Sequence, residues 1–183
     1  FIPLQWTIFL GAGLSLVLYI MATSKQVGLH SLVKNENGRW EEQDMPEEFA
    51  SNEITAIAVE GLDFFAEVPV LEDEMPSVRD LTGAAITLRL RGLETVTSTG
   101  LKWLETFLND LQTGNNHMLL AGVEPHVMEI FKKTGFSDLV GEENLFVAEP
   151  GYGASLDAAW DAASEWLEAS EKAVESAAES TAT

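Results

Sequence analysis

The first 22 residues of the chain carry no charge, and this run limits the folds open to the chain more than any other feature. As a helix, a run of this length spans about 30 Å, which is the thickness of the hydrocarbon core of a bilayer. Gly11 and Gly13 would let a neighbouring helix approach closely, and Trp6 lies near one end, where indole rings favour the membrane interface. We therefore expect a transmembrane helix over residues 1–22, the last of several in a longer protein.

Two other interpretations of this run remain open. A secretory signal peptide has a basic segment before its apolar part, and nothing basic precedes the apolar residues here. A buried helix of a soluble domain is the second alternative. Basic residues follow the run at Lys25, His30, Lys34 and Arg39. Because basic residues near a helix end favour the cytoplasm, we expect the rest of the chain on that side.

The composition of the chain limits the kinds of partner and site that it can have. Its 183 residues suffice for one ordinary domain with extensions. The 30 acidic and 10 basic residues give a net charge of −20, which would repel nucleic acids and anionic lipid surfaces. The chain has no cysteine, which excludes disulfides, thiolate nucleophiles and cysteine metal sites.

Strand and helix patterns alternate along the rest of the chain. We expect strands at 27–33, 39–43, 53–59, 85–90, 117–122 and 144–147, the first two forming a hairpin. We expect helices that begin at Pro69, cover 101–111, run from Pro125 to Gly135, and begin again at Ser155. This alternation predicts an α/β layer with a mostly parallel centre.

The apolar positions of these elements predict the interior. The residues expected in the core are Ile57, Val59, Leu88, Leu90, Leu104, Leu108, Leu119 and Ile130.

A small polar cluster lies where a strand meets a helix. The strand at 85–90 is followed by a turn and then by Ser98, Thr99 and Gly100, at the start of the helix. A helix start offers free backbone N–H groups and a partial positive charge. A hydroxyl of Ser98 or Thr99 there either caps the helix or accepts a phosphate. This segment is therefore the candidate phosphorylation or partner-binding loop.

No other pattern points to catalysis. His30, His117 and His126 lack the spacing of metal ligands, and Ser98 has no nearby histidine motif that would complete a triad. The acidic residues from Asp157 onward recur at helical spacing and predict a solvated face, with a calcium site as the alternative. We expect no enzyme activity, no cofactor and no metal site.

Several short segments together resemble one known family. They are IPLQ at 2–5, LGAGLSLVLY at 10–19, GLDFFA at 61–66, LRLRG at 88–92, STG at 98–100, LAGV at 120–123 and KTG at 133–135. In this order they resemble the carboxyl end of a SulP-type anion permease, of the sulfate permease family. The resemblance implies a last transmembrane helix at 1–22, a linker and first hairpin at 23–52 and a STAS domain at 53–168. The remaining residues, 169–183, are acidic and lose the apolar stripe, so we expect a disordered tail there.

The resemblance also implies a function. The STAS domain, with helices packed on a mixed sheet, would be the cytoplasmic regulatory and assembly domain of a secondary transporter for sulfate, bicarbonate or a related anion. The protein would be a multi-pass protein of the inner membrane. Its partners would be the rest of the membrane domain, a second copy in a homodimer and a regulatory protein, but no nucleic acid. The alternative is a membrane-tethered STAS signalling module that resembles the anti-sigma-factor antagonists.

The same resemblance bears on Ser98. In the soluble STAS relatives, an Asp precedes a Ser that a partner kinase phosphorylates, and Ser98 occupies the place of that Ser. Thr97 stands where the Asp would be. This departure favours capping and loop packing over phosphorylation.

Overall fold

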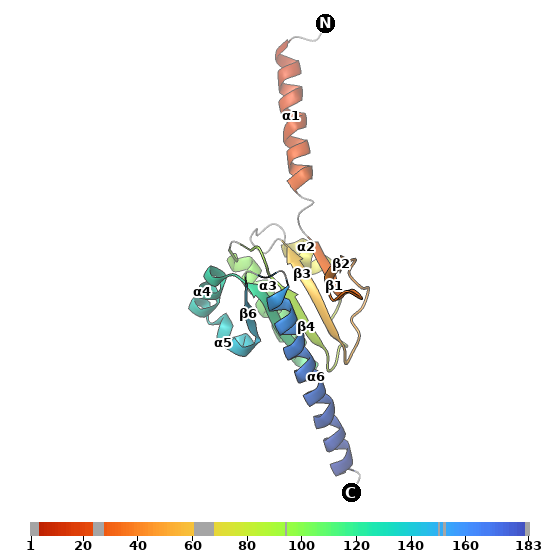
Figure 1. Cartoon of the computed structure of the whole chain (residues 1–183). Helices are drawn as coiled ribbons and strands as arrows, with labels where there is room; N and C mark the ends of the chain where they lie inside the picture. Colours follow the sequence, from red (N-terminus) through yellow and green to blue (C-terminus); the bar gives the residue numbers. More distant parts are fainter. Residues whose placement is uncertain are drawn as a thin grey trace.

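A helix, α1 (Leu4–Thr23), precedes a mixed α/β domain in the computed structural model (Figure 1). The structure describes residues 4–23, 28–60, 68–93, 95–149, 151 and 153–181. The apolar side chains described in α1 are exposed to solvent, including Phe9 at 71% and Leu10 at 76%. No helix in the described part of the chain is long and apolar enough to cross a membrane. A helix is thus present at Leu4–Thr23, over the described part of the predicted segment, and its span of a membrane stays a prediction.

One six-stranded sheet forms the centre of the domain. Its strands are β1 (Gly28–Lys34), β2 (Trp40–Gln43), β3 (Ile54–Glu60), β4 (Ala85–Arg89), β5 (His117–Val123) and β6 (Leu145–Val147). They lie in the order β2-β1-β3-β4-β5-β6. The pairs β1–β2 and β1–β3 are antiparallel, and the pairs from β3 to β6 are parallel. This arrangement confirms the predicted α/β class with a parallel centre.

Helices cover both faces of the sheet (Figure 1). One face carries α2 (Val68–Glu74), α3 (Ser98–Thr113), α4 (Pro125–Thr134) and α5 (Phe136–Val140). The other face is crossed by α6 (Ala154–Thr181). A short 3-10 helix, η2 (Glu142–Asn144), leads into β6. Because alternate residues of a strand point to opposite faces, central strands such as β3, β4 and β5 supply both layers of the interior.

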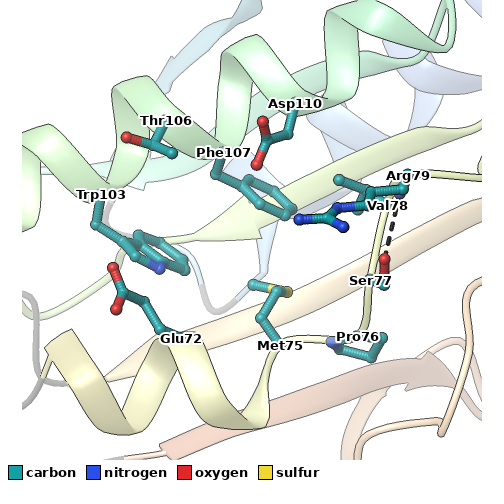
Figure 2. Close-up of a pocket in the computed structure, with 10 residues that line it drawn as sticks. All are labelled: Glu72, Met75, Pro76, Ser77, Val78, Arg79, Trp103, Thr106, Phe107 and Asp110. Carbon is teal, nitrogen blue, oxygen red and sulfur yellow. Dashed lines mark hydrogen bonds between the residues drawn. The ribbon is translucent and has the colours of Figure 1, made fainter.

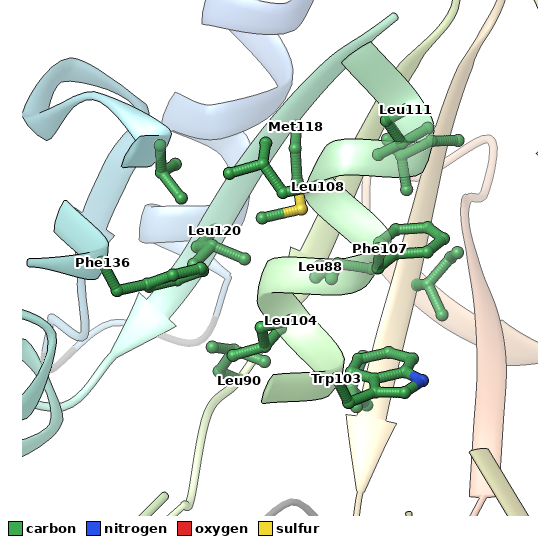
Figure 3. Close-up of a cluster of buried hydrophobic side chains, with 14 of the residues drawn as sticks. Leu88, Leu90, Trp103, Leu104, Phe107, Leu108, Leu111, Met118, Leu120 and Phe136 are labelled. Carbon is green, nitrogen blue, oxygen red and sulfur yellow. The ribbon is translucent and has the colours of Figure 1, made fainter. Parts of the chain in front are cut away.

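The larger core lies between the sheet and α3, as Figure 3 shows. Seven of the eight predicted core residues are buried, and Leu104 of α3 is fully enclosed. The eighth, Ile130, is only half-buried, so its prediction as a core residue is wrong. In α4 the buried residues are Val127 and Phe131, one helical turn apart. Ile130 lies beside that stripe rather than on it.

The core of α3 is also wider than the leucine pattern predicts. Trp103 and Phe107 are both buried, each at 6% exposed, and their rings stack with centroids 5.6 Å apart. They broaden the apolar face of α3 beyond the stripe of leucines, towards α2.

The sheet face beneath α6 is built from small side chains. Its buried residues include Ala56, Ala58, Ala85 and Ala121. Small residues let a helix lie close to the strands, and Ala159 and Ala163 of α6 are fully buried there. The helix continues to Thr181, further than the sequence pattern indicates, since the segment 169–183 is expected to be disordered. Its alanine- and glutamate-rich composition favours helix even where no apolar stripe remains.

Two other expectations differ in detail. The five-residue helix α5 is absent from the predicted elements, because Gly135 ends α4 in a left-handed conformation and the helix restarts directly after it. The segment GLDFFA at 61–66, part of the family resemblance, lies outside the described residues.

Candidate functional site

The start of α3 lies at the end of a loop whose apolar residues are anchored in the core. Leu93 and Val96 are buried on either side of this turn. The side chain of Thr97 then accepts a hydrogen bond from the backbone N–H of Gly100, at 3.1 Å. Thr97 is therefore the capping residue of α3, and its extended backbone conformation is typical of that position.

Ser98 and Thr99 are exposed at the first turn of α3, whereas Gly100 is buried. The expectation that Ser98 or Thr99 caps the helix is therefore wrong by one position. The physical reason is spacing, since a cap side chain reaches the N–H two or three residues ahead, and the acceptor used is Thr97. Both exposed hydroxyls remain accessible to another molecule.

A groove lies beside the same helix, between α2 and α3 (Figure 2). It has a volume of about 300 Å³. Its walls come from the end of α2, the segment after it and the outer face of α3. The sequence patterns did not predict this groove, because helical periodicity reports which residues face inward but not where two helices leave a gap.

A comparison with protein families identifies the domain. The STAS domain family matches residues 50–149, which is more than half of the chain. The chain belongs to the STAS domain family. The match covers β3 to β6 and the helices between them, and β1, β2 and α6 lie outside the matched range.

Two solved structures share the fold of this STAS domain. A sulfate transporter family protein from Wolinella succinogenes is 21% identical with a TM-score of 0.50, and the match covers 68% of this chain and 97% of that one. The murine Solute Carrier 26 family member A9 anion transporter, in its inward-facing state, is 13% identical with a TM-score of 0.60. That match covers 89% of this chain but only 26% of the mouse chain. No curated protein sequence shows significant similarity.

Polar and aromatic contacts join the hairpin of β1 and β2 to the start of α6. The ammonium of Lys34 lies 2.7 Å from Oδ1 of Asp157, and Nε1 of Trp40 donates to the same carboxylate at 3.1 Å. Lys34 first, and Trp40 to a smaller extent, hold the pKa of Asp157 below its usual value. Trp40 also meets Trp160 edge to face, with centroids 5.3 Å apart. These contacts thus hold the start of α6 on the β1–β2 end of the sheet.

His117 of β5 contacts the middle of α6. Its ring stacks on Trp166 with centroids 4.8 Å apart, and its Nε2 lies 2.9 Å from Oδ1 of Asn144. Burial lowers the pKa of His117, while the bond to Asn144 and the charge of Glu143 act in the opposite direction. Among the described residues, no group of three histidine or acidic side chains is arranged to hold a metal ion.

Proposed function

We propose that this chain is the carboxyl end of a SulP-type anion transporter, in which α1 is the last membrane helix and the STAS domain regulates and assembles the transporter in the cytoplasm. The observation that carries the proposal is order along the chain. A helix within an uncharged run directly precedes a domain of the STAS family. The shared fold with an anion transporter and with a sulfate transporter family protein supports it.

The surface of α1 supports its place in a membrane. The described part of the helix exposes large apolar side chains, among them Leu14 at 59% and Leu16 at 61%. Exposing several such residues together on one helix is unfavourable in water and favourable against lipid. The uncharged run also extends from Phe1 to Ala22, beyond the residues of α1 whose side chains the structure describes.

The role of the STAS domain in this proposal is contact rather than catalysis. The exposed first turn of α3, with Ser98 and Thr99, is the surface through which a partner acts. That partner is the membrane domain of the same transporter or a regulatory protein, and the transporter works as a homodimer. The high net negative charge fits a protein partner better than an anionic lipid surface.

The membrane assignment is tested by charging α1. The full chain is expressed in bacteria, and the membranes are washed at alkaline pH, which removes proteins that do not cross the bilayer. Leu14→Lys with Leu16→Lys places two charges mid-helix, at a cost of about 2.5–3.5 kcal/mol each if that segment is in lipid. We expect the wild-type chain to stay in the washed membranes and the double variant to be released.

Val174→Lys is the matched control, because Val174 is an equally exposed apolar residue of α6, at 66%. We expect it to behave as the wild type. Release of the wild-type chain, or retention of the double variant, contradicts a membrane position for α1. If the chain stays in the washed membranes but the full-length protein transports no anion, the result would favour the membrane-tethered signalling module instead.

A further inference from the structure

The groove between α2 and α3 brings together charged groups of both signs that find no charged partner among the residues that the structure describes. Arg79, Asp110 and Glu72 all line it. Within the described residues, none of their charged groups forms an ion pair or a side-chain hydrogen bond; the backbone N–H of Arg79 donates to Ser77, and the backbone carbonyl of Asp110 accepts from Thr113. Figure 2 shows Arg79 and Asp110 at one end of the groove and Glu72 at the other.

Unpaired charge of this kind is unusual for the basic residues of this protein. Lys102, Lys132 and Lys133, on α3 and α4, each lie within 3.4 Å of a carboxylate oxygen. Arg79 does not, although the chain has three acidic residues for every basic one. A guanidinium is well suited to binding a carboxylate, because its N–H groups form a planar fork.

Between the two charged ends, the groove is apolar. Met75 and Val78 lie on the α2 side, and the buried rings of Phe107 and Trp103 lie on the α3 side. A volume of about 300 Å³ is at the small end of the range for ligand sites, which combine an apolar lining with a few polar groups. The groove therefore fits a small molecule better than a folded partner.

We propose that this groove binds a free amino acid with an apolar side chain. The carboxylate of the ligand pairs with Arg79, its ammonium pairs with Asp110, and its side chain lies on Met75 and Phe107. This site is independent of the transporter assignment, since it uses neither α1 nor the first turn of α3.

The two signs of charge exclude simpler ligands. A plain anion at Arg79 would be repelled by Asp110 and Glu72, and a plain cation at Asp110 would be repelled by Arg79. A zwitterion satisfies both groups at once, and its two charges lie a few ångströms apart, as adjacent groups of opposite sign require. The apolar lining then selects the side chain, because burying it removes apolar surface from water.

Calorimetric titration of the full chain, purified in detergent, tests this site with L-phenylalanine as the probe. We expect saturable binding in the millimolar range. L-phenylalaninamide lacks the carboxylate charge and N-acetyl-L-phenylalanine lacks the ammonium, so each should bind about tenfold more weakly or not at all. Arg79→Gln and Asp110→Asn should each weaken the binding of L-phenylalanine by about tenfold.

Arg39→Gln and Asp138→Asn are the controls, since both residues are exposed and lie outside the groove. We expect them to bind as the wild type does, with unchanged circular dichroism for all four variants. The proposal is overturned if L-phenylalanine does not bind, if the amide and the acetyl derivative bind as well as the amino acid, or if the groove variants match the controls.

Discussion

The backbone N–H of Gly100 donates to the side-chain oxygen of Thr97 at 3.1 Å, and this hydrogen bond defines the beginning of α3. It leaves Ser98 and Thr99 exposed in the first turn, where their hydroxyls take no part in capping. An aspartate in place of Thr97 would accept the same bond, because Asp is as good a cap as Thr. The Thr97 found here therefore preserves the geometry of the loop while removing a negative charge next to Ser98.

The cap gives a first prediction. Thr97→Ala should lower the free energy of unfolding by about 0.5–2 kcal/mol, since it removes the acceptor for Gly100 N–H. Ser98→Ala should change it by less than about 0.5 kcal/mol, as expected for an exposed side chain outside the cap. Urea unfolding followed by circular dichroism measures both. A larger loss for Ser98→Ala than for Thr97→Ala would contradict the cap assignment.

A second prediction concerns Ser98 as a contact residue. Ser98→Asp should keep or raise the melting temperature, because a carboxylate in the first turn interacts favourably with the helix dipole, by about 0.3–1 kcal/mol. If the chain belongs to a full-length transporter, as proposed, we expect the variant to change anion uptake without any loss of stability. If uptake is unchanged, the first turn of α3 has no role in regulation.

The interior gives a third prediction, with a built-in comparison. Leu104 lies on the buried face of α3, so Leu104→Ala should lower the free energy of unfolding by about 2–5 kcal/mol. Ile130→Ala removes a similar side chain from a half-buried position on α4 and should cost distinctly less. Equal losses in urea unfolding would mean that α4 packs more tightly than the structure shows.

A fourth prediction follows from His117. Burial lowers its pKa in the folded protein below the ordinary value of 6.5, so the unfolded chain binds a proton more readily. Its contribution to stability is complete above pH 6.5 and is lost as the pH falls through the lower pKa of the folded state. The melting temperature of the wild type should therefore fall, relative to that of His117→Gln, as the pH is lowered below 6.5.

His126→Gln is the control for this comparison, because His126 is exposed on α4. It should follow the pH profile of the wild type. A His117→Gln profile parallel to the wild type would show that the ring carries no burial penalty at the contact with Trp166.

The elements of this fold were predictable because each has a strong local signal. Buried strands such as β4, and the helix boundaries at Pro125 and Gly135, appear directly in the sequence. The cap of α3 was misplaced by one residue, since Thr97, Ser98 and Thr99 all have hydroxyls and only the backbone geometry separates them. A local sequence pattern does not specify which of three adjacent hydroxyl residues caps the helix.

Features that depend on tertiary contact were not predictable in the same way. The pairing of Lys34 with Asp157 joins residues far apart in the sequence, and the stacking of His117 on Trp166 depends on where α6 crosses the sheet. The groove with Arg79 likewise arises from the spacing between two helices. Each results from packing that no single segment encodes.

Anion uptake by the full-length transporter tests the central claim most directly. Uptake of sulfate and of bicarbonate is measured in membrane vesicles for the intact protein and for one that ends after Thr23, with equal amounts of protein in the membrane. We expect the intact protein to take up at least one of these anions, and the shortened protein, which keeps α1 but lacks the STAS domain, to be strongly impaired. Uptake of neither anion by the intact protein, or equal uptake by both forms, would contradict a regulatory STAS domain of an anion transporter.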